Sequence, residues 1–209
     1  MFGSALRLLG SFVSPAIQAT QSPAKPMQVD QDLWYRLTGL SQMPSLPQAV
    51  LDQGEASCLF SEGKKVKESH ILICVPEGFS LCKLFQLCGK STDFLNEEDL
   101  NECAGPYWCY VYMGSFGKFL GDKDIATKVA NKEHEMPTLL EVGLAIWAYR
   151  SLKNEMLFEG EQEAVLAQDS SNKLTAIGAD SSNKFFSLYS SSYQSYGTAP
   201  VIRFSETII

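Results

Sequence analysis

The sequence predicts an α+β fold: a mainly antiparallel sheet of about five strands with a central buried helix and several short helices. Three observations support this prediction. Residues 136–152 are apolar around almost their whole helical circumference, as in a helix that is covered on most sides. Two runs of β-type residues, at 70–75 and 107–113, are typical of strands. A turn motif, Asp-Ser-Ser-Asn-Lys, begins at Asp169 and again at Asp180, each time before an apolar run, which favours an antiparallel meander.

The chain is predicted to comprise a mobile N-terminal arm, residues 1–30, and one globular domain, residues 31–209. A chain of 209 residues with 45% hydrophobic residues can bury a single sizeable core. Residues 1–19 carry only one charge, Arg7, and lack the basic start of a secretory signal. Pro23 and Pro26 then lie in a linker-like stretch.

Two short helices are predicted at the start of the domain. The first spans residues 31–40, with Trp34 and Leu37 facing inward and Gly39 ending it. Ser45 is predicted to cap the second helix. The core face of this second helix is predicted to hold Leu46, Val50 and Leu51.

The first strong strand is predicted at His70–Val75. Its five consecutive apolar residues indicate a strand that is covered on both faces and therefore central in its sheet. Ser80 then caps a predicted helix that ends at Gly89. The core face of that helix is predicted to hold Leu81, Leu84, Phe85 and Leu87.

A glycine-rich segment follows the aromatic strand Tyr107–Met113. Its glycines, at 114, 117 and 121, match neither the dinucleotide-binding pattern nor the P-loop, so we predict a plain turn without a phosphate. Asp124 is predicted to cap the next short helix.

The buried helix at 136–152 has terminal residues that suit a helix. Pro137 fits the first turn, Thr138 and Glu141 are polar near the N-terminus, and Arg150 suits the last turn. The stretch is shorter than the roughly 20 residues that cross a bilayer, and Glu141 would lie inside the membrane. We therefore predict no transmembrane segment. Residues 159–168 are compatible with either a helical extension or a loop, and residues 199–204 predict a last strand.

Charge and cysteine usage limit the classes of partner and cofactor. The net charge of −7 and the pI near 4.9 oppose binding to nucleic acid, which requires clustered Lys and Arg. Cysteines within apolar runs are expected to be reduced thiols, which favours a cytoplasmic location. No spacing matches a zinc pattern, and the acidic run at 93–102 lacks the turn glycine of a calcium loop, so neither a metal nor a cofactor is predicted. The six cysteines are Cys58, Cys74, Cys82, Cys88, Cys103 and Cys109.

Two Cys/His pairs are the candidates for catalysis. Cys109 and His134 could form a thiolate pair, with Glu135 or Glu141 orienting the imidazole. His70 and Cys74 are a second pair, because side chains two and four residues apart share one face of a strand. Both cysteines lie in apolar runs of an acidic chain, whereas a reactive thiol needs electropositive surroundings. The alternative interpretation is that both cysteines belong to the core.

Several segments together resemble a known domain family. WYRLTGL, SLPQAVLDQ, GKKVKESHILICVP, YWCYVYMGS, HEMPTLLEVGLAIWAYRSL and YGTAPVIRF are similar to the successive blocks of an uncharacterised family from obligately intracellular bacteria and some larger multidomain proteins. The resemblance covers roughly residues 31–204 and implies the same order of elements. The family has no established activity, so the resemblance implies no site residues.

The sequence therefore predicts a non-catalytic binding or structural module whose partner is a protein. Tyrosines in the Ser/Tyr-rich segment 190–197 could form a contact surface, or could pack over the edge of the sheet. Two alternatives remain: a thiol-dependent hydrolase with a Cys/His pair, and a host-directed interaction protein of an intracellular bacterium. The second alternative follows from the resemblance alone.

Overall fold

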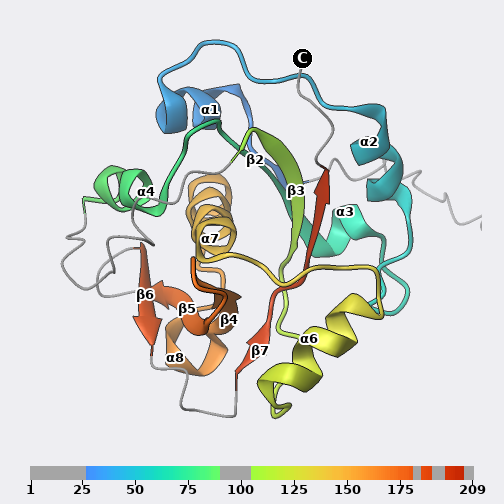
Figure 1. Cartoon of the computed structure of the whole chain (residues 1–209). Helices are drawn as coiled ribbons and strands as arrows, with labels where there is room; N and C mark the ends of the chain where they lie inside the picture. Colours follow the sequence, from blue (N-terminus) through green and yellow to red (C-terminus); the bar gives the residue numbers. More distant parts are fainter. Residues whose placement is uncertain (1–26, 90–104, 181–184, 190–195, 205–209) are drawn as a thin grey trace, which may run out of the picture.

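The computed structural model describes residues 27–89, 105–180, 185–189 and 196–204 and has an α+β fold, as predicted (Figure 1). Helix α7, Leu139–Lys153, lies at the centre and contacts strands of two separate sheets. Its first ten residues are all buried, and Thr138 and Glu141 form a capping box at its N-terminus. The prediction of a central buried helix is therefore confirmed.

The first sheet has the strand order β1-β2-β3-β8. Its two long strands, β2 (His70–Val75) and β3 (Tyr107–Tyr112), pair antiparallel along their whole length. The short strand β1 (Met27–Gln28) pairs parallel to β2, and β8 (Val201–Phe204) pairs antiparallel to β3. Every residue of β2 is buried, which confirms its predicted central position.

The second sheet has the order β6-β5-β4-β7. The strands β5 (Leu174–Asp180) and β6 (Phe185–Tyr189) follow the two turn motifs and pair antiparallel, as predicted. The prediction of a helical extension or a loop for residues 159–168 is wrong for Val165–Gln168, which form strand β4 and pair antiparallel with β5. Asp169 forms the turn between β4 and β5, because its Oδ1 accepts hydrogen bonds from the backbone N–H groups of Ser171 and Lys173. The parallel edge strand β7, Gly197–Thr198, completes this sheet.

The prediction of one mainly antiparallel sheet of about five strands is wrong, because the strands divide between two mixed sheets of four strands each. The chain passes from one sheet to the other between Thr198 at the end of β7 and Val201 at the start of β8. Pro200 lies in this connection, and its missing N–H cannot extend a strand ladder. The final apolar run therefore pairs with β3 instead of with the meander.

The shorter helices surround this framework (Figure 1). Two of them begin or end as predicted: Asp30 and Gly39 cap α1, and the Ser80 side chain caps α4. Ser45 does not cap α2, whose N-cap is Pro47, and α6 begins two residues before Asp124. The helices are α1 (Gln31–Thr38), α2 (Gln48–Glu55), α3 (Val66–Ser69), α4 (Leu81–Leu87), α6 (Asp122–Ala130) and α8 (Gly160–Glu163).

The predicted boundaries and surfaces at the ends of the chain are described in part. Residues 1–26 of the predicted arm, the acidic run and most of segment 190–197 lie outside the described residues. The last residues of the predicted arm belong to the fold, because β1 pairs with β2 and Asp30 caps α1. Among the described residues, no helix is both long and apolar enough to cross a membrane.

Candidate functional site

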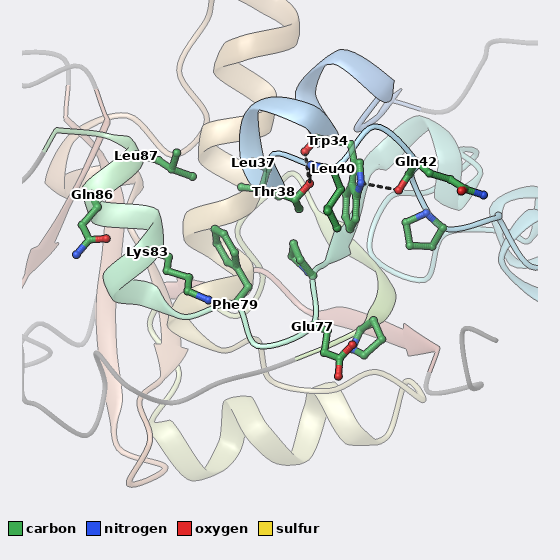
Figure 2. A pocket seen from close by; sticks show the side chains of 13 residues that line it. Trp34, Leu37, Thr38, Leu40, Gln42, Glu77, Phe79, Lys83, Gln86 and Leu87 are labelled. Carbon is green, nitrogen blue, oxygen red and sulfur yellow. Dashed lines mark hydrogen bonds between the residues drawn. The ribbon is translucent and has the colours of Figure 1, made fainter.

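A pocket of about 810 Å³ lies between α1 and α4 (Figure 2). Two segments that are distant in the sequence build most of it: α1 with the loop that follows, and the loop after β2 together with α4. Pro106, before β3, also lines the pocket. A volume of this size lies within the range of pockets that bind small molecules or side chains of a partner. Its lining residues are Trp34, Leu37, Thr38, Leu40, Gln42, Pro44, Pro76, Glu77, Phe79, Lys83, Gln86, Leu87 and Pro106.

Hydrogen bonds fix the wall that α1 contributes. The indole Nε1 of Trp34 donates to the Gln42 carbonyl at 2.9 Å, which ties the loop after α1 back to the helix. The Thr38 hydroxyl donates to the Trp34 carbonyl at 2.8 Å. Trp34 itself is 3% exposed, so the pocket floor is set by a tightly held aromatic side chain. This wall is therefore formed before any ligand arrives.

The mouth of the pocket exposes large apolar side chains on both sides. Leu40, beyond the end of α1, is 59% exposed, and Leu87, in the last turn of α4, is 45% exposed. Leu87 was predicted to face the core, and this prediction is wrong: Leu87 is the last residue of α4 and is exposed, whereas Leu81, Leu84 and Phe85 are buried as predicted. These two leucines expose apolar surface to solvent, and the buried Phe79 side chain lines the same pocket.

Charged groups of opposite sign border this apolar surface. Lys83 donates from Nζ to the Gly78 carbonyl at 2.7 Å, which leaves its other ammonium protons open to a ligand. Glu77 is exposed and has neither a hydrogen-bond nor an ion-pair partner within the described part of the chain. An apolar centre with a polar, charged rim is the usual anatomy of a protein-binding surface.

Cys109, the predicted nucleophile, is fully buried in β3. Burial, and secondly the nearby charge of Glu141, raises the pKa of its thiol well above the usual value. A thiol nucleophile needs the opposite shift, because the thiolate is the reactive form. The surroundings of Cys109 therefore suit a core residue.

The structure does not bring Cys109 and His134 together. Cys109 pairs with Ile73 and Arg203, whereas His70 pairs with Tyr112, and alternation along the strands places Cys109 and His70 on opposite faces of the sheet. The His134 ring lies beside His70, with 6.1 Å between the ring centroids. The two predicted partners are thus on opposite sides of the first sheet.

Glu141 and Glu135, the predicted orienting groups, bind Arg203 instead of an imidazole. The Arg203 guanidinium donates to Glu141 through Nε at 2.6 Å and Nη2 at 2.7 Å, and to Glu135 through Nη1 at 2.5 Å. The Tyr107 hydroxyl also donates to Glu141, at 3.0 Å. With these bonds and its capping bonds to Thr138, the buried carboxylate is fully engaged in holding α7 to β8.

His70 and Cys74 do share one face of β2, as predicted. However, they are four residues apart, which is about 13 Å along a strand. Burial raises the pKa of the Cys74 thiol to about 12, and burial, followed by the proximity of His134, lowers the pKa of His70 to about 3. A thiolate–imidazolium pair would require both shifts to have the opposite sign.

Sequence reasoning did not find the pocket. Its walls come from α1, a loop and α4, and no local pattern shows that these segments meet. One signal was present: the loop residues Leu40, Pro44, Pro76 and Pro106 are apolar although they lie outside regular elements. No family model, curated protein or solved structure matches the chain, so the resemblance to the uncharacterised family stays a prediction.

Proposed function

We propose that this chain is a non-catalytic binding module that accepts an apolar segment of a partner protein in the pocket between α1 and α4. The observation that carries the proposal is the pair of exposed leucines, Leu40 and Leu87, above a floor of buried Trp34 and Phe79. Such exposed apolar groups cost free energy in water and gain it when a partner covers them.

The rim of the pocket supports a peptide-like partner. Lys83 and Glu77 carry opposite charges on the same rim, so the partner segment is expected to carry a basic and an acidic group beside its apolar anchor. Charges of this kind contribute to specificity and association rate more than to affinity. The host-directed role implied by the sequence resemblance is one version of this proposal, with a host protein as the partner.

The test is a selection of binders from a random peptide library displayed on phage, with the full chain as target. We expect enriched peptides to share an apolar anchor and to lose at least about tenfold in affinity for Leu40→Gln/Leu87→Gln, since two apolar contacts of about 1 kcal/mol or more are removed. Both leucines are exposed, so the double variant is expected to fold as the wild type does.

A matched control comes from Leu51, which is 41% exposed on α2 and does not line the pocket. Leu51→Gln should bind the selected peptides as the wild type does. Equal binding of the peptides to Leu40→Gln/Leu87→Gln would contradict the proposal. If no peptide is enriched while an apolar dye binds the wild type and not the double variant, the pocket is a small-molecule site.

A further inference from the structure

The two histidines of the chain meet on the face of the first sheet opposite to Cys109. His70 begins β2 and is completely buried, and His134, after α6, is 8% exposed. Their ring centroids are 6.1 Å apart, and the Phe60 ring lies edge-on to His134 at 4.6 Å. Each imidazole presents a buried Nε2 atom that has no hydrogen-bond partner within the described part of the structure. Buried polar atoms without a partner are rare, so this coincidence requires a cause.

Backbone contacts determine which ring nitrogen carries the proton. The Nδ1 of His134 lies 2.6 Å from the Lys132 carbonyl, and the Nδ1 of His70 lies 3.2 Å from the Val66 carbonyl. A carbonyl oxygen can only accept, so Nδ1 of the neutral His134 ring carries the hydrogen. The Nδ1 of His70 also lies 3.0 Å from the Ser69 hydroxyl oxygen, and that hydroxyl donates its own hydrogen to the Lys65 carbonyl at 2.9 Å. We therefore assign the hydrogen to Nδ1 of His70 as well, which leaves the lone pair on both Nε2 atoms. An Nδ1–H bound to a backbone carbonyl is also the arrangement that orients histidines whose Nε2 binds a metal.

We propose that His70 and His134 form a two-ligand binding site for a monovalent copper ion, held by the Nε2 atoms of the two rings. Imidazole nitrogen is a suitable ligand for copper. In a linear arrangement, two metal–nitrogen bonds of about 2 Å and a distance of about 1 Å from each nitrogen to its ring centroid place the centroids about 6 Å apart. The observed separation of 6.1 Å agrees with this.

The surroundings favour a monovalent ion with a low coordination number. Within the described residues, no group of three or more His, Cys, Asp or Glu side chains could hold a metal, so a tetrahedral zinc site is not built. Because the cost of burying an ion rises with the square of its charge, burial disfavours a divalent ion more than a monovalent one.

The test is a ¹⁵N NMR measurement of the imidazole nitrogens during anaerobic titration with Cu⁺. The chain has only two histidines, so the spectrum contains only these two rings. To avoid copper capture by accessible thiols, the titration uses the full chain with Cys82→Ser, Cys88→Ser and Cys103→Ser. These substitutions remove the two partly exposed thiols and the one outside the described residues. We expect both Nε2 resonances to move together and to saturate at one ion per chain.

The variant His134→Gln gives the control. Its remaining His70 Nε2 resonance should not move at the same ion concentration, and the affinity for Cu⁺ should fall at least about tenfold. Zn²⁺ at one equivalent should move neither resonance. If His134→Gln does not fold, the proposal is still tested by whether the Nε2 resonances of both rings shift together in the parent protein when Cu⁺ is added.

Three results would overturn the proposal. The first is that neither Nε2 resonance moves at one equivalent of Cu⁺, in which case a buried water satisfies the two nitrogens. The second is that only one ring responds. The third is an equal response to Zn²⁺, which would remove the assignment to a monovalent ion.

Discussion

Arg203 illustrates at the scale of one residue how the fold keeps a charge in its interior. Glu141 is completely buried, and its two oxygens accept bonds from the guanidinium, the Tyr107 hydroxyl and the N-terminus of α7. A buried carboxylate that loses its counter-ion remains desolvated without compensation. Arg203 also joins β8 to the segment before α7, because its Nη2 donates to the Met136 carbonyl at 2.9 Å.

We therefore expect Arg203→Met to lower the free energy of unfolding by about 3–5 kcal/mol, measured by urea denaturation. The exposed ion pair between Lys118 and Glu163 provides the comparison, since Glu163 is 61% exposed. Lys118→Met should change the same quantity by less than about 1 kcal/mol. Similar losses in the two variants would show that Arg203 and Glu141 are not a buried pair in solution.

A second prediction at this scale concerns Gly54, in the last turn of α2. Glycine to alanine in a helix ordinarily stabilises by roughly 0.5–1 kcal/mol. Here an added Cβ would lie 2.6 Å from the Tyr110 hydroxyl oxygen, which donates to the Val50 carbonyl in the same helix. We expect Gly54→Ala to destabilise by about 1–3 kcal/mol instead, because the ring must move and its hydrogen bond is lost.

A double-mutant cycle tests this reversal of sign. In Tyr110→Phe the hydroxyl is absent, and the nearest ring atom, Cζ, lies 3.5 Å from the added Cβ, an ordinary contact. Gly54→Ala should then be neutral or stabilising in that background, as measured by thermal and urea unfolding. If Gly54→Ala destabilises both backgrounds equally, another contact causes the loss.

At the scale of the element, local patterns predicted the existence and type of most helices and strands. The capping residues Ser80 and Gly39 act where the sequence placed helix ends, because a cap is a contact between near neighbours in the chain. Pro137, predicted in the first turn of the central helix, instead precedes the N-cap Thr138. The partners of each strand could not be predicted in this way. Strand β8 pairs with β3, whose residues lie far earlier in the chain, as in the pair Trp108 and Phe204. Strands β1 and β7 have only two residues each.

The same difference between local and long-range contacts explains why the residues of the candidate site were not predicted. Leu87 has the spacing of a core residue, yet its exposure depends on whether another element covers the last turn of α4, which is a tertiary fact. The proximity of His70 and His134 is likewise set by the return of the chain after α6. The residue types in the sequence identify these side chains as candidates, but only the tertiary structure shows which of them are in contact.

At the scale of the whole molecule, α7 connects the two sheets into one core. It contacts β2 and β3 on one side and β4, β5 and β6 on the other. The largest cluster of buried side chains contains residues of both sheets, for example Ile73 and Ile177. We therefore expect the two sheets to unfold together in one cooperative transition.

The rates at which the thiols are alkylated test this cooperativity. Cys74 and Cys109 are buried in the first sheet, whereas Cys82 and Cys88 on α4 are partly exposed. With iodoacetamide near neutral pH, we expect Cys82 and Cys88 to react in the native protein. Cys74 and Cys109 should react only through the unfolded state, because burial removes access and raises the pKa of both thiols.

The urea dependence of these rates decides between core residues and a reactive site. If Cys74 and Cys109 are labelled only after global unfolding, the free energy of opening calculated from each labelling rate falls with urea along one common slope. That slope should equal the m-value of the unfolding transition followed by tryptophan fluorescence. Mass spectrometry of the peptides gives each rate separately. A rate for Cys109 that exceeds the others in the absence of urea would show a lowered thiol pKa, and would make thiol catalysis the better account of this protein than binding alone.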